Sequence, residues 1–471
     1  MADESRGGRA AAAAVLCEIT EKAAYANDAL RKDFAANPRM DAREKAFATE
    51  LVNGALRNMI RLDHIVGAFS SAPIEKMQPF ILNLLRISVY QIRFMDRVPE
   101  SAAVNEAVKL AKEAGFEGLS GFVNGLLRNV IREPGKPAFP TKPEVSSSGD
   151  SPPHMKADEF GRAEKLLSYY ISLNYSFPKW LADSLISWLG RERALKFCEG
   201  SAEPPRVAVF ANTLLTTAET LAKRLGSEGV DCVPGRIHSE CLSLRKTSDI
   251  TRLDSFREGL FFVIDENAVT AAKALGCGRG ETVADICAAP GGKAFTLACL
   301  TGCGAKIFAY DVKPHRIKLM EDGIKRLKLT NINAAVCDMA AARVNAGGFA
   351  DRVLLDAPCS GFGTIRKRPE IKYARGDSDI RELVAKQRAL LASAAACLKK
   401  GGTLVYCTCT VAREENIGNV RWFLKKFPFE SAPIDHGTDG ETSFVEESCL
   451  QILPDSGGDA FFIARMTKKD E

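Results

Sequence analysis

Long stretches without charge are missing from this sequence. No run of transmembrane length is free of Asp, Glu, Lys and Arg, so a membrane-spanning helix is not expected. The first residues contain Arg6 and Arg9 and then a short alanine run, which lacks the bulky apolar core of a secretory signal peptide. We therefore expect a cytoplasmic protein that does not associate with membranes.

Paired cysteine spacings are also missing, although the chain has 14 Cys. A disulfide framework or a zinc site would require Cys at short, repeated spacings. The nearest approach to such a pattern is Cys232, His238 and Cys241, which lacks a fourth ligand at a usable spacing. We expect free thiols in a reducing compartment and no bound metal.

A strong excess of one charge is absent as well. The formal net charge is +5, which permits a nucleic-acid partner without requiring one. The 471 residues are too many for one ordinary domain, and an apolar fraction of 46% is enough for most of them to form cores. Two or three domains are expected.

Hydrophobic periodicity and proline content divide the chain into four parts. Residues 1–132 have apolar residues at spacings of three and four, which predicts helices throughout. Residues 133–158 contain six Pro and a Ser-Ser-Ser-Gly run, which predicts an extended, mobile linker. Residues 159–275 begin with a helical stretch and continue as mixed α/β structure, and residues 276–471 form a further α/β domain.

From Thr282 onward, predicted strands alternate strictly with predicted helices. The longest helical pattern runs from Asp379 to Leu398. This alternation predicts a parallel sheet with helices on both faces, which is a doubly wound, Rossmann-like α/β fold. The predicted strands are Thr282–Ile286, Lys306–Tyr310, Asn333–Val336, Arg352–Leu355 and Thr403–Cys407.

Acidic residues follow four of these strands, and a glycine turn follows the first. The acids are Asp285, Asp311, Asp338 and Asp356, and the turn is Cys287-Ala288-Ala289-Pro290-Gly291-Gly292-Lys293. The turn fits neither a P-loop nor the pattern G-x-G-x-x-G. One such Asp is more often a helix cap. Four of them beside a glycine turn predict a nucleoside-containing cofactor, with Asp311 placed to bind ribose.

Two cysteine motifs also follow strands of the predicted sheet. Asp356-Ala357-Pro358-Cys359-Ser360-Gly361 follows one strand, and Thr408-Cys409-Thr410 follows another. A thiolate that adds to carbon 6 of cytosine makes carbon 5 nucleophilic toward a methyl donor. A carboxyl group stabilises the charge that develops on the ring, and a base removes the proton from carbon 5. Two Cys and one Asp match this chemistry, whereas methyl transfer to nitrogen or oxygen needs no thiol.

The identity of the nucleophile stays open at this point. A lone Cys is most often a small buried hydrophobe. Cys407 lies two residues from Cys409, so the two side chains can share one face of a strand. Spacing alone does not choose between them.

These motifs together resemble the RsmB/Sun family of ribosomal RNA cytosine-5 methyltransferases. Residues 285–293 look like the family's cofactor motif, and residues 356–361, 366–369, 401–416 and 458–462 look like its later motifs. The resemblance implies S-adenosyl-L-methionine as the cofactor and 16S ribosomal RNA as the substrate. It also implies that residues 276–471 are the catalytic methyltransferase domain.

The N-terminal part resembles the NusB-like RNA-binding domain that this family carries. The matching stretches are residues 46–52, 85–99 and 122–128. The resemblance implies that residues 1–132 are this all-α domain and that residues 159–275 form an intermediate RNA-recognition region. We expect the protein to be a monomer.

The resemblance also implies roles for individual residues. Cys409 matches the covalent nucleophile, and Cys359 matches the second Cys, which assists release of the methylated base. Asp356 matches the acid that contacts cytosine and lies by the cofactor. The implied cofactor-binding residues are Cys287, Ala288, Ala289, Pro290, Gly291, Gly292, Lys293, Asp311, Asp338 and Asp356.

Some positions depart from the family pattern. Most concern the surroundings of the motifs, and the changes in the tail bear on RNA contacts near residues 453–462. The departures are Ala460 for a usual Gly, Asp455 for a frequent His, Phe362 for a common Thr, Ala294-Phe295 for a Thr pair, and the additional thiol of Cys407.

Two basic clusters near the predicted site suit contacts with RNA phosphates. A charge run seen alone is more often a solvated face, but these runs lie beside the cofactor and thiol motifs. The first cluster is Arg366, Lys367, Arg368, Lys372 and Arg375, and the second is Lys313, His315, Arg316 and Lys318.

Two alternatives remain. The catalytic motifs do not separate ribosomal RNA from transfer RNA as the substrate of a cytosine-5 methyltransferase. A non-catalytic RNA-binding assembly factor with a relic methyltransferase fold is the other class, and the intact Asp356, Cys359 and Cys409 argue against it.

Overall fold

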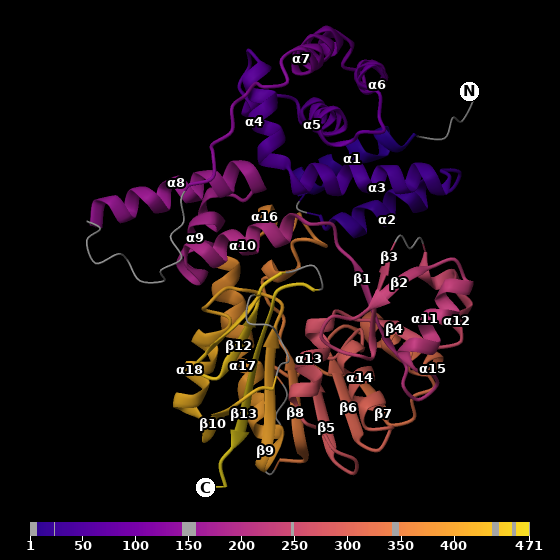
Figure 1. Cartoon of the computed structure of the whole chain (residues 1–471), viewed down its shortest axis with the longest axis vertical. Coiled ribbons are helices and arrows are strands. Elements are labelled where there is room, and N and C mark those ends of the chain that lie inside the picture. Colours follow the sequence, from indigo (N-terminus) through magenta and orange to yellow (C-terminus); the bar gives the residue numbers. More distant parts are fainter. Residues whose placement is uncertain are drawn as a thin grey trace. The chain divides into compact units, whose positions relative to one another are not determined.

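Two compact units make up the chain (Figure 1). The computed structural model describes residues 7–22, 24–143, 157–245, 249–341, 348–435, 442–454 and 458–470. The helical unit consists of residues 1–202 together with 367–374, and the sheet unit consists of residues 203–366 and 375–471.

The helical unit is built from α-helices, as the apolar spacing predicts. The helices that precede the proline-rich stretch are α1 (Gly8–Lys22), α2 (Ala26–Ala36), α3 (Ala42–Arg57), α4 (Met59–Phe69), α5 (Pro79–Phe94), α6 (Glu100–Glu113) and α7 (Ser120–Arg132), with the short helices η1 (Ile74–Lys76) and η2 (Glu117–Leu119). Those that follow it are α8 (Ala157–Tyr175), α9 (Lys179–Leu189) and α10 (Arg191–Ala202).

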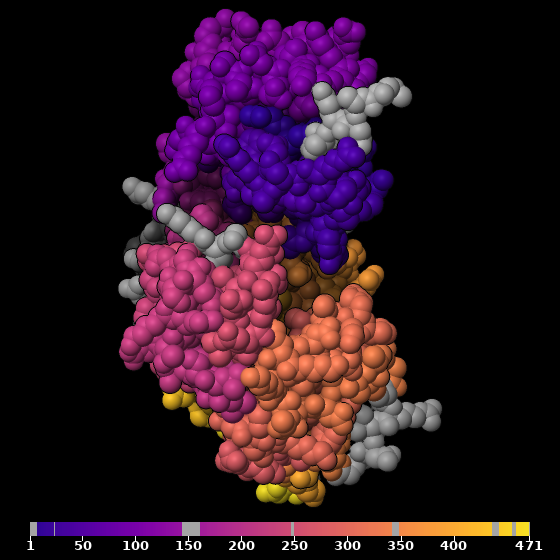
Figure 2. Space-filling view, turned by 90° about the vertical axis from the view of Figure 1, so that its right-hand side faces the viewer, coloured from indigo at the N-terminus to yellow at the C-terminus, as the bar shows by residue number. Residues whose placement is uncertain are grey.

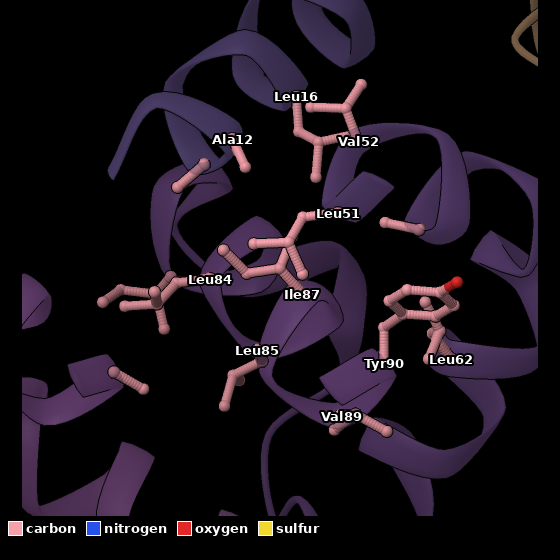
Figure 3. Close-up of a cluster of buried hydrophobic side chains, with 14 of the residues drawn as sticks. Ala12, Leu16, Leu51, Val52, Leu62, Leu84, Leu85, Ile87, Val89 and Tyr90 are labelled. Carbon is pink, nitrogen blue, oxygen red and sulfur yellow. The ribbon is translucent and has the colours of Figure 1, made fainter. Parts of the chain in front are cut away.

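The core of this unit forms around α5, which contacts α1, α3, α4, α6 and α7 (Figure 3). The ring of Tyr90 packs against α3 at the side of the core, and its hydroxyl donates a hydrogen bond to Glu50 Oε1 at 2.7 Å. A Cβ atom on Gly54 of α3 would lie only 2.1 Å from Tyr90 Cζ. The two helices can pack this closely because residue 54 has no side chain.

The first part of the predicted linker is packed onto the helical unit. The ring of Phe139 packs against the hydrophobic core. The Arg93 guanidinium, at the end of α5, donates to four backbone carbonyls at and just beyond the end of α7. The predicted mobility is therefore wrong for residues 133–139, because Arg93 satisfies carbonyls that a helix end leaves unpaired. Residues 144–156, which include the serine run, lie outside the described residues.

A segment from much later in the chain also belongs to the helical unit. It contains α16 (Ile371–Ala374). Lys372 Nζ and the Tyr373 hydroxyl each donate to two backbone carbonyls at the ends of α3 and α8, at 2.9–3.2 Å. Burial lowers the pKa of Lys372 to about 7. The prediction that Lys372 contacts RNA phosphates is wrong, since its buried amino group donates to the carbonyls at two helix ends instead.

The sheet unit contains a nine-stranded sheet in the order β11-β12-β13-β9-β8-β5-β6-β7, with β10 paired to β13 (Figure 1). The pairings among β5 to β9 are parallel, which confirms the doubly wound arrangement. The strands are β5 (Thr282–Ile286), β6 (Lys306–Asp311), β7 (Ile332–Val336), β8 (Ala350–Asp356), β9 (Leu398–Thr408), β10 (Phe429–Ala432), β11 (Ser443–Glu446), β12 (Cys449–Ile452) and β13 (Phe461–Lys468).

The four C-terminal strands pair antiparallel, so the sheet is mixed. The sequence analysis did not predict this extension. β11 and β12 are joined by a two-residue turn, and a connection this short permits only antiparallel pairing. The alternation of strands and helices therefore stops after α18 (Ile417–Lys426).

Helices cover both faces of the sheet. The helices α13 (Glu266–Ala274), α14 (Gly292–Leu300) and α15 (Pro314–Arg326) contribute to the core on one face, and α17 (Asp377–Cys397) and α18 contribute to the core on the other. Val283 of β5 joins the first core and its neighbour Ala284 joins the second. Successive side chains of a strand point to opposite faces, so apolar residues are needed at both positions.

A second, four-stranded sheet in the order β2-β3-β1-β4 lies against the larger one, and its pink surface adjoins the orange surface of the larger sheet's residues in Figure 2. The buried Asn212 amide joins the two, because Nδ2 donates to the carbonyls of Gly259 and Leu327, each at 3.0 Å. Its elements are β1 (Val207–Ala211), α11 (Ala218–Ser227), β2 (Asp231–Pro234), β3 (Cys241–Arg245), α12 (Asp254–Arg257) and β4 (Phe261–Val263).

Among the described residues, no helix is both long and apolar enough to cross a bilayer. The same part of the chain contains no cluster of three or more His, Cys, Asp or Glu side chains arranged to bind a metal ion. His238 Nε2 lies 2.9 Å from Thr270 Oγ1, and Cys241 is buried in a hydrophobic core.

The close packing of α3 on α5 leads to a stability prediction. Gly54→Ala should lower the free energy of unfolding by about 1–3 kcal/mol, because the new methyl group overlaps the Tyr90 ring. Gly125→Ala is the matched control, since a Cβ at this exposed position of α7 would meet nothing within 4 Å. The control should raise stability by up to about 1 kcal/mol through helix propensity. Urea unfolding followed by circular dichroism measures both, and a shift of the same sign in both variants would contradict the packing argument.

The burial of Lys372 leads to a pH prediction. Its pKa is about 7 in the folded protein and near 10.5 when unfolded, so the unfolded chain binds more protons between these values. Stability should therefore rise with pH in this range, and Lys372→Met should remove that contribution. The difference in unfolding free energy between the natural protein and the variant should change from pH 7 to pH 10. A constant difference would count against a neutral buried lysine, and exposed Lys109→Met should show no pH-dependent difference.

Candidate active site

The carboxyl ends of the central parallel strands lie at one edge of the sheet. Ile286 of β5 pairs with Tyr310 of β6 on one side and with Leu355 of β8 on the other. Asp356 of β8 pairs with Cys407 of β9. The register therefore brings the glycine turn, the acid-bearing strand ends and both cysteine motifs to this edge.

The glycine turn leads from β5 into the N-terminus of α14. Ala288 N donates to the carbonyl of Tyr310 at 2.8 Å, which joins the turn to the neighbouring strand. Cys287 and Gly291 have left-handed backbone conformations, with φ of 67° and 113°. A Cβ on Gly291 would lie 2.3 Å from the ring of Phe295, a residue at which this chain departs from the family pattern. The turn presents its backbone and the free N–H groups of the helix to a ligand.

Asp285, just before the turn, has a fully buried side chain. Neither of its carboxylate oxygens has a hydrogen-bond partner within the described part of the chain. Burial raises the pKa of Asp285 to about 8. A buried carboxyl group without partners is uncommon in a folded protein and marks a place for a polar ligand.

The next two predicted acids have different surroundings. Asp311 is almost fully buried; its Oδ1 accepts from Lys313 N at 3.0 Å, and its Oδ2 lies 3.2 Å from Arg316 Nη1. Arg316 also donates to the carbonyl of Ala289 in the turn. Arg316 therefore links β6 to the glycine turn, so the structure gives it a role that the predicted basic cluster did not anticipate.

Asp338 follows β7 and is exposed. Its Oδ1 accepts from Ala340 N at 3.0 Å, which is the ordinary behaviour of an aspartate in a turn. Asp338 is predicted to bind the cofactor only because it follows a strand. The structure shows no contact between Asp338 and the other predicted cofactor residues among the residues that it describes.

Asp356, at the end of β8, pairs with the lysine of the glycine turn. Lys293 Nζ lies 2.7 Å from Asp356 Oδ2, and Cys407 Sγ lies 3.7 Å from Oδ1. Burial lowers the pKa of Lys293, but the charge of Asp356 and the hydrogen bond to it outweigh that effect, so the pKa is raised. Lys293 thus stays charged and fixes the Asp356 carboxylate between the turn and β9.

The two predicted catalytic thiols lie together. Cys359 Sγ is 3.3 Å from Cys409 Sγ, far longer than a disulfide bond of about 2.05 Å, and both are free thiols. The hydrogen bond with Cys409, together with burial, raises the pKa of Cys359 well above its ordinary value. Both side chains are partly exposed, whereas Cys407 is fully buried. The structure thereby distinguishes the partly exposed Cys409 from the buried Cys407, which sequence spacing alone could not do.

A buried carboxyl group fixes the two thiol loops to each other. Glu415 accepts from Ser360 N at 2.9 Å, from Ser360 Oγ at 2.5 Å and from Gln387 Nε2 at 2.8 Å. Ser360 Oγ also lies 2.7 Å from Thr410 Oγ1. Ser360 and Thr410 each directly follow a predicted catalytic Cys, so one buried network sets the distance between the thiols.

The sequence analysis missed this network. Glu415 is fully buried, and burial raises its pKa although four hydrogen bonds oppose that shift. The only sequence signal was an acid pair, Glu414-Glu415, followed by Asn416 before an apolar helix. Asn416 in turn donates to the Thr410 carbonyl at 3.0 Å. Gln387 lies in the middle of α17, where nothing in the sequence distinguishes it from a surface residue.

The basic loop after Cys359 is only in part the exposed cluster that the sequence predicts, because Lys367 and Arg368 are exposed but Arg366 is not. The Arg366 side chain is 3% exposed, donates to the carbonyl of Gly458, and has Nε 4.0 Å from Asp459 Oδ1. The backbone N–H of Asp459 in turn donates to Asp265 Oδ2 at 3.2 Å. The phosphate contact predicted for Arg366 is wrong, because the closing motif of the chain occupies its guanidinium.

One edge of the sheet thus carries two free thiols, the Lys293–Asp356 ion pair and the glycine turn. Three models of known protein families match this chain, and together they cover most of it. The model described as "16S rRNA methyltransferase RsmB/F" matches residues 272–467, and that of the "NusB family" matches residues 6–132. A model of the ferredoxin-like domain of RsmF/B-like methyltransferases matches residues 177–251. The last of these spans α9, α10 and most of the four-stranded sheet.

Relatives of similar length support the same grouping. The chain is 34% identical over 459 residues to the probable ribosomal RNA small subunit methyltransferase B of Bacillus subtilis, covering 96% of this chain and 97% of that protein. It is 30% identical to the ribosomal RNA small subunit methyltransferase B of Cronobacter sakazakii, with 92% of each chain covered.

Among solved structures, the crystal structure of PH0851 matches with a TM-score of 0.74 and 25% identity, covering 98% of this chain and 99% of that one. The fold, the motifs and full-length similarity agree. The chain belongs to the 16S rRNA methyltransferase RsmB/F family.

Proposed function

We propose that the protein methylates carbon 5 of a cytosine in 16S ribosomal RNA, with S-adenosyl-L-methionine as the methyl donor and Cys409 as the covalent nucleophile. The observation that carries this proposal is the pair of free thiols 3.3 Å apart at the sheet edge that also bears Asp356 and the glycine turn. The family description and the names of the relatives favour the 16S substrate.

The residues present at the edge suit a nucleoside sulfonium. The buried carboxyl group of Asp285 has no hydrogen-bond partner in the described ranges, and it lies beside the turn with the free N–H groups at the start of α14. Asp311 lies at the end of the next strand, where an acid typically contacts ribose hydroxyls. When bound there, S-adenosyl-L-methionine supplies the methyl group that carbon 5 takes up.

Cys409 performs the first step on cytosine. Its thiolate forms a bond to carbon 6, and the electron pair of the 5,6 double bond moves so that carbon 5 becomes nucleophilic. Cys409 suits this role better than Cys407, because its side chain is partly exposed and the other is fully buried. The carboxyl group of Asp356 contacts the base near N3 and stabilises the charge that develops there.

Cys359 serves the last step. Its Sγ lies 3.3 Å from Cys409 Sγ, and this hydrogen bond together with burial raises the pKa of Cys359 well above its ordinary value. After methylation, a general base takes the proton from carbon 5, and the electron pair of that C–H bond restores the 5,6 double bond. The bond between carbon 6 and sulfur breaks at the same time, and its electron pair returns to Cys409. Cys359 assists this elimination from 3.3 Å away.

The direct test is methyl transfer from radiolabelled S-adenosyl-L-methionine to 16S ribosomal RNA transcribed in vitro. The product nucleoside is then identified by chromatography after digestion. Label in 5-methylcytidine supports the proposal. Label in another nucleoside, or label only in transfer RNA offered in parallel, would overturn it.

Variants that lack one or the other thiol should be blocked at different steps of the reaction. Cys409→Ala should bind RNA but form no covalent adduct, because the atom that bonds carbon 6 is gone. Cys359→Ala should still attack, and elimination should stall, so protein joined to methylated RNA accumulates. Both variants should lose turnover by at least about a hundredfold, within the range typical of removing a catalytic group. A denaturing gel with labelled RNA separates them.

Cys407→Ala is the control for this comparison, since its buried thiol has no assigned step. It should keep turnover within a few fold of the natural protein. A shifted protein–RNA band from Cys409→Ala, with none from Cys359→Ala, would mean that the two roles are reversed.

Cofactor binding should depend on Asp311. Asp311→Ala should weaken binding of S-adenosyl-L-methionine by about 1–3 kcal/mol, because ribose hydroxyls lose a buried acceptor. Asp322→Ala, an exposed change on α15, should leave the affinity unchanged. Isothermal titration calorimetry measures both. Equal affinities in folded Asp311→Ala and natural protein would remove Asp311 from the ribose site.

A further inference from the structure

The helical unit contains a cavity of about 290 Å³ that the proposed reaction does not use. Arg61 and Ile65 of α4 and Arg93 and Phe94 of α5 form one side, and residues 134–139 form the other. These last residues belong to the stretch that the sequence predicts to be a mobile linker. Their packing on the helices creates the cavity.

The lining of this cavity is cationic. It includes Arg61, Arg93 and Lys136 and no Asp or Glu. Desolvation by burial lowers the pKa of both arginines, which means that neither is fully compensated by a nearby acid. Gathering three positive side chains around a partly dry space is unfavourable without an anion. The lining therefore suits an anionic ligand.

The three cations are not equivalent. Arg93 is occupied by the backbone carbonyls that it caps, so it shapes the wall and adds charge. The Arg61 Nε atom is buried and has no hydrogen-bond partner in the part of the chain that the structure describes. Lys136 is exposed at the mouth of the cavity. Arg61 and Lys136 are therefore the groups that can contact a ligand directly.

Aromatic rings fix both of these cations in place. The Arg61 guanidinium carbon lies 5.0 Å from the ring centroid of Phe94 and 5.0 Å from that of Phe139. Lys136 Nζ lies 5.2 Å from the ring centroid of Phe69. A guanidinium held between two rings loses little further freedom on binding, and its planar fork matches two oxygens of a phosphate.

The volume and the aromatic walls indicate more than a bare phosphate. Small-molecule sites usually measure roughly 300–1,000 Å³, and this cavity of about 290 Å³ lies just below that range. Aromatic faces beside cations are the usual means by which proteins bind the bases and phosphates of single-stranded RNA.

We propose that this cavity binds one nucleotide of single-stranded RNA, with its phosphate contacted by Arg61 and Lys136 and its base in the remaining volume of the cavity. The proposal rests on the proposed function in one respect, since it takes RNA as the substrate. A free phosphate or mononucleotide has the same chemistry, and the experiment separates these sources.

The test compares two charge reversals in the full chain. Lys136→Glu reverses the charge of an exposed side chain at the cavity mouth. Lys109→Glu makes the same change at a side chain that is 61% exposed in α6. Affinity for 16S ribosomal RNA transcribed in vitro is measured by filter binding at several salt concentrations, without a methyl donor.

Lys136→Glu should weaken RNA binding at least tenfold and lower the slope of log affinity against log salt by about one. Lys109→Glu should stay within about twofold of the natural protein. Equal effects of the two changes would overturn the proposal, because they would show only an effect of net charge. Arg61→Lys, which keeps the charge but not the fork, should lie between the natural protein and Lys136→Glu, and natural affinity in this variant would remove Arg61 from the contact.

A second measurement identifies the source of the phosphate. Thermal unfolding is followed with inorganic phosphate and with uridine monophosphate, for the natural protein and Lys136→Glu. Stabilisation of the natural protein alone, with unchanged RNA affinity in the variant, would show that the cavity takes a free phosphate compound and would overturn RNA as the ligand. Because RNA binding is measured without methylation, failure of the proposed cytosine chemistry leaves this result unaffected, and the reverse also holds.

Discussion

The parallel pairing of β8 with β9 is the constraint on which the candidate site depends. It places Asp356 beside Cys407 and sends the two following loops out from the same sheet edge. The loops would still be free to separate without a further constraint. The buried Glu415 carboxyl group supplies it, since it accepts from the residue after Cys359 and, through Ser360, is linked to the residue after Cys409. A carboxyl group buried without water is costly unless several donors satisfy it. That cost makes the network specific, because moving either loop would leave Glu415 with unpaired oxygens.

The same edge carries two aspartates, one whose charge is paired with a lysine and one that has no hydrogen-bond partner among the described residues. Asp356 has Lys293 at 2.7 Å, so its charge is balanced before any ligand arrives. Asp285 is fully buried and has no hydrogen-bond partner among the described residues, and burial raises its pKa to about 8. The difference follows from the chain path: Lys293 is on the first turn of α14 and points toward β8, while Asp285 precedes the turn. The carboxyl group near the thiols is therefore already paired, whereas the carboxyl group before the glycine turn has hydrogen-bond acceptors with no partner among the described residues.

The sequence predicted the parts of this structure that depend on local pattern. Strand β5 has the predicted bounds, and the other parallel strands differ from theirs by a few residues at most, except β9, which begins five residues earlier. Residues at strand ends were also identified, because the strand order of a doubly wound sheet brings those ends together. Features that depend on partners distant in sequence were missed. The four antiparallel strands, the Glu415 network and the packed residues 133–139 all require contacts that no short-range pattern records.

The basic run from Arg366 to Arg375 shows why such partners matter for function. In the sequence it is a cluster of positive charge beside a catalytic motif. In the structure, Arg366 is bound to the closing motif of the chain, and Lys372 caps the ends of two helices of the helical unit, to which it belongs. Both side chains are nearly inaccessible, at 3% and 1% exposed. The density of positive charge along the sequence therefore overstates the number of cations that RNA can reach. A better indicator of a phosphate site is a desolvated cation whose polar atoms are not all paired within the described part of the protein. By that criterion the helical unit, which is not notably basic, contains a better phosphate site than the basic loop, because Arg61 has aromatic neighbours on two sides and no acid among the residues that line its cavity.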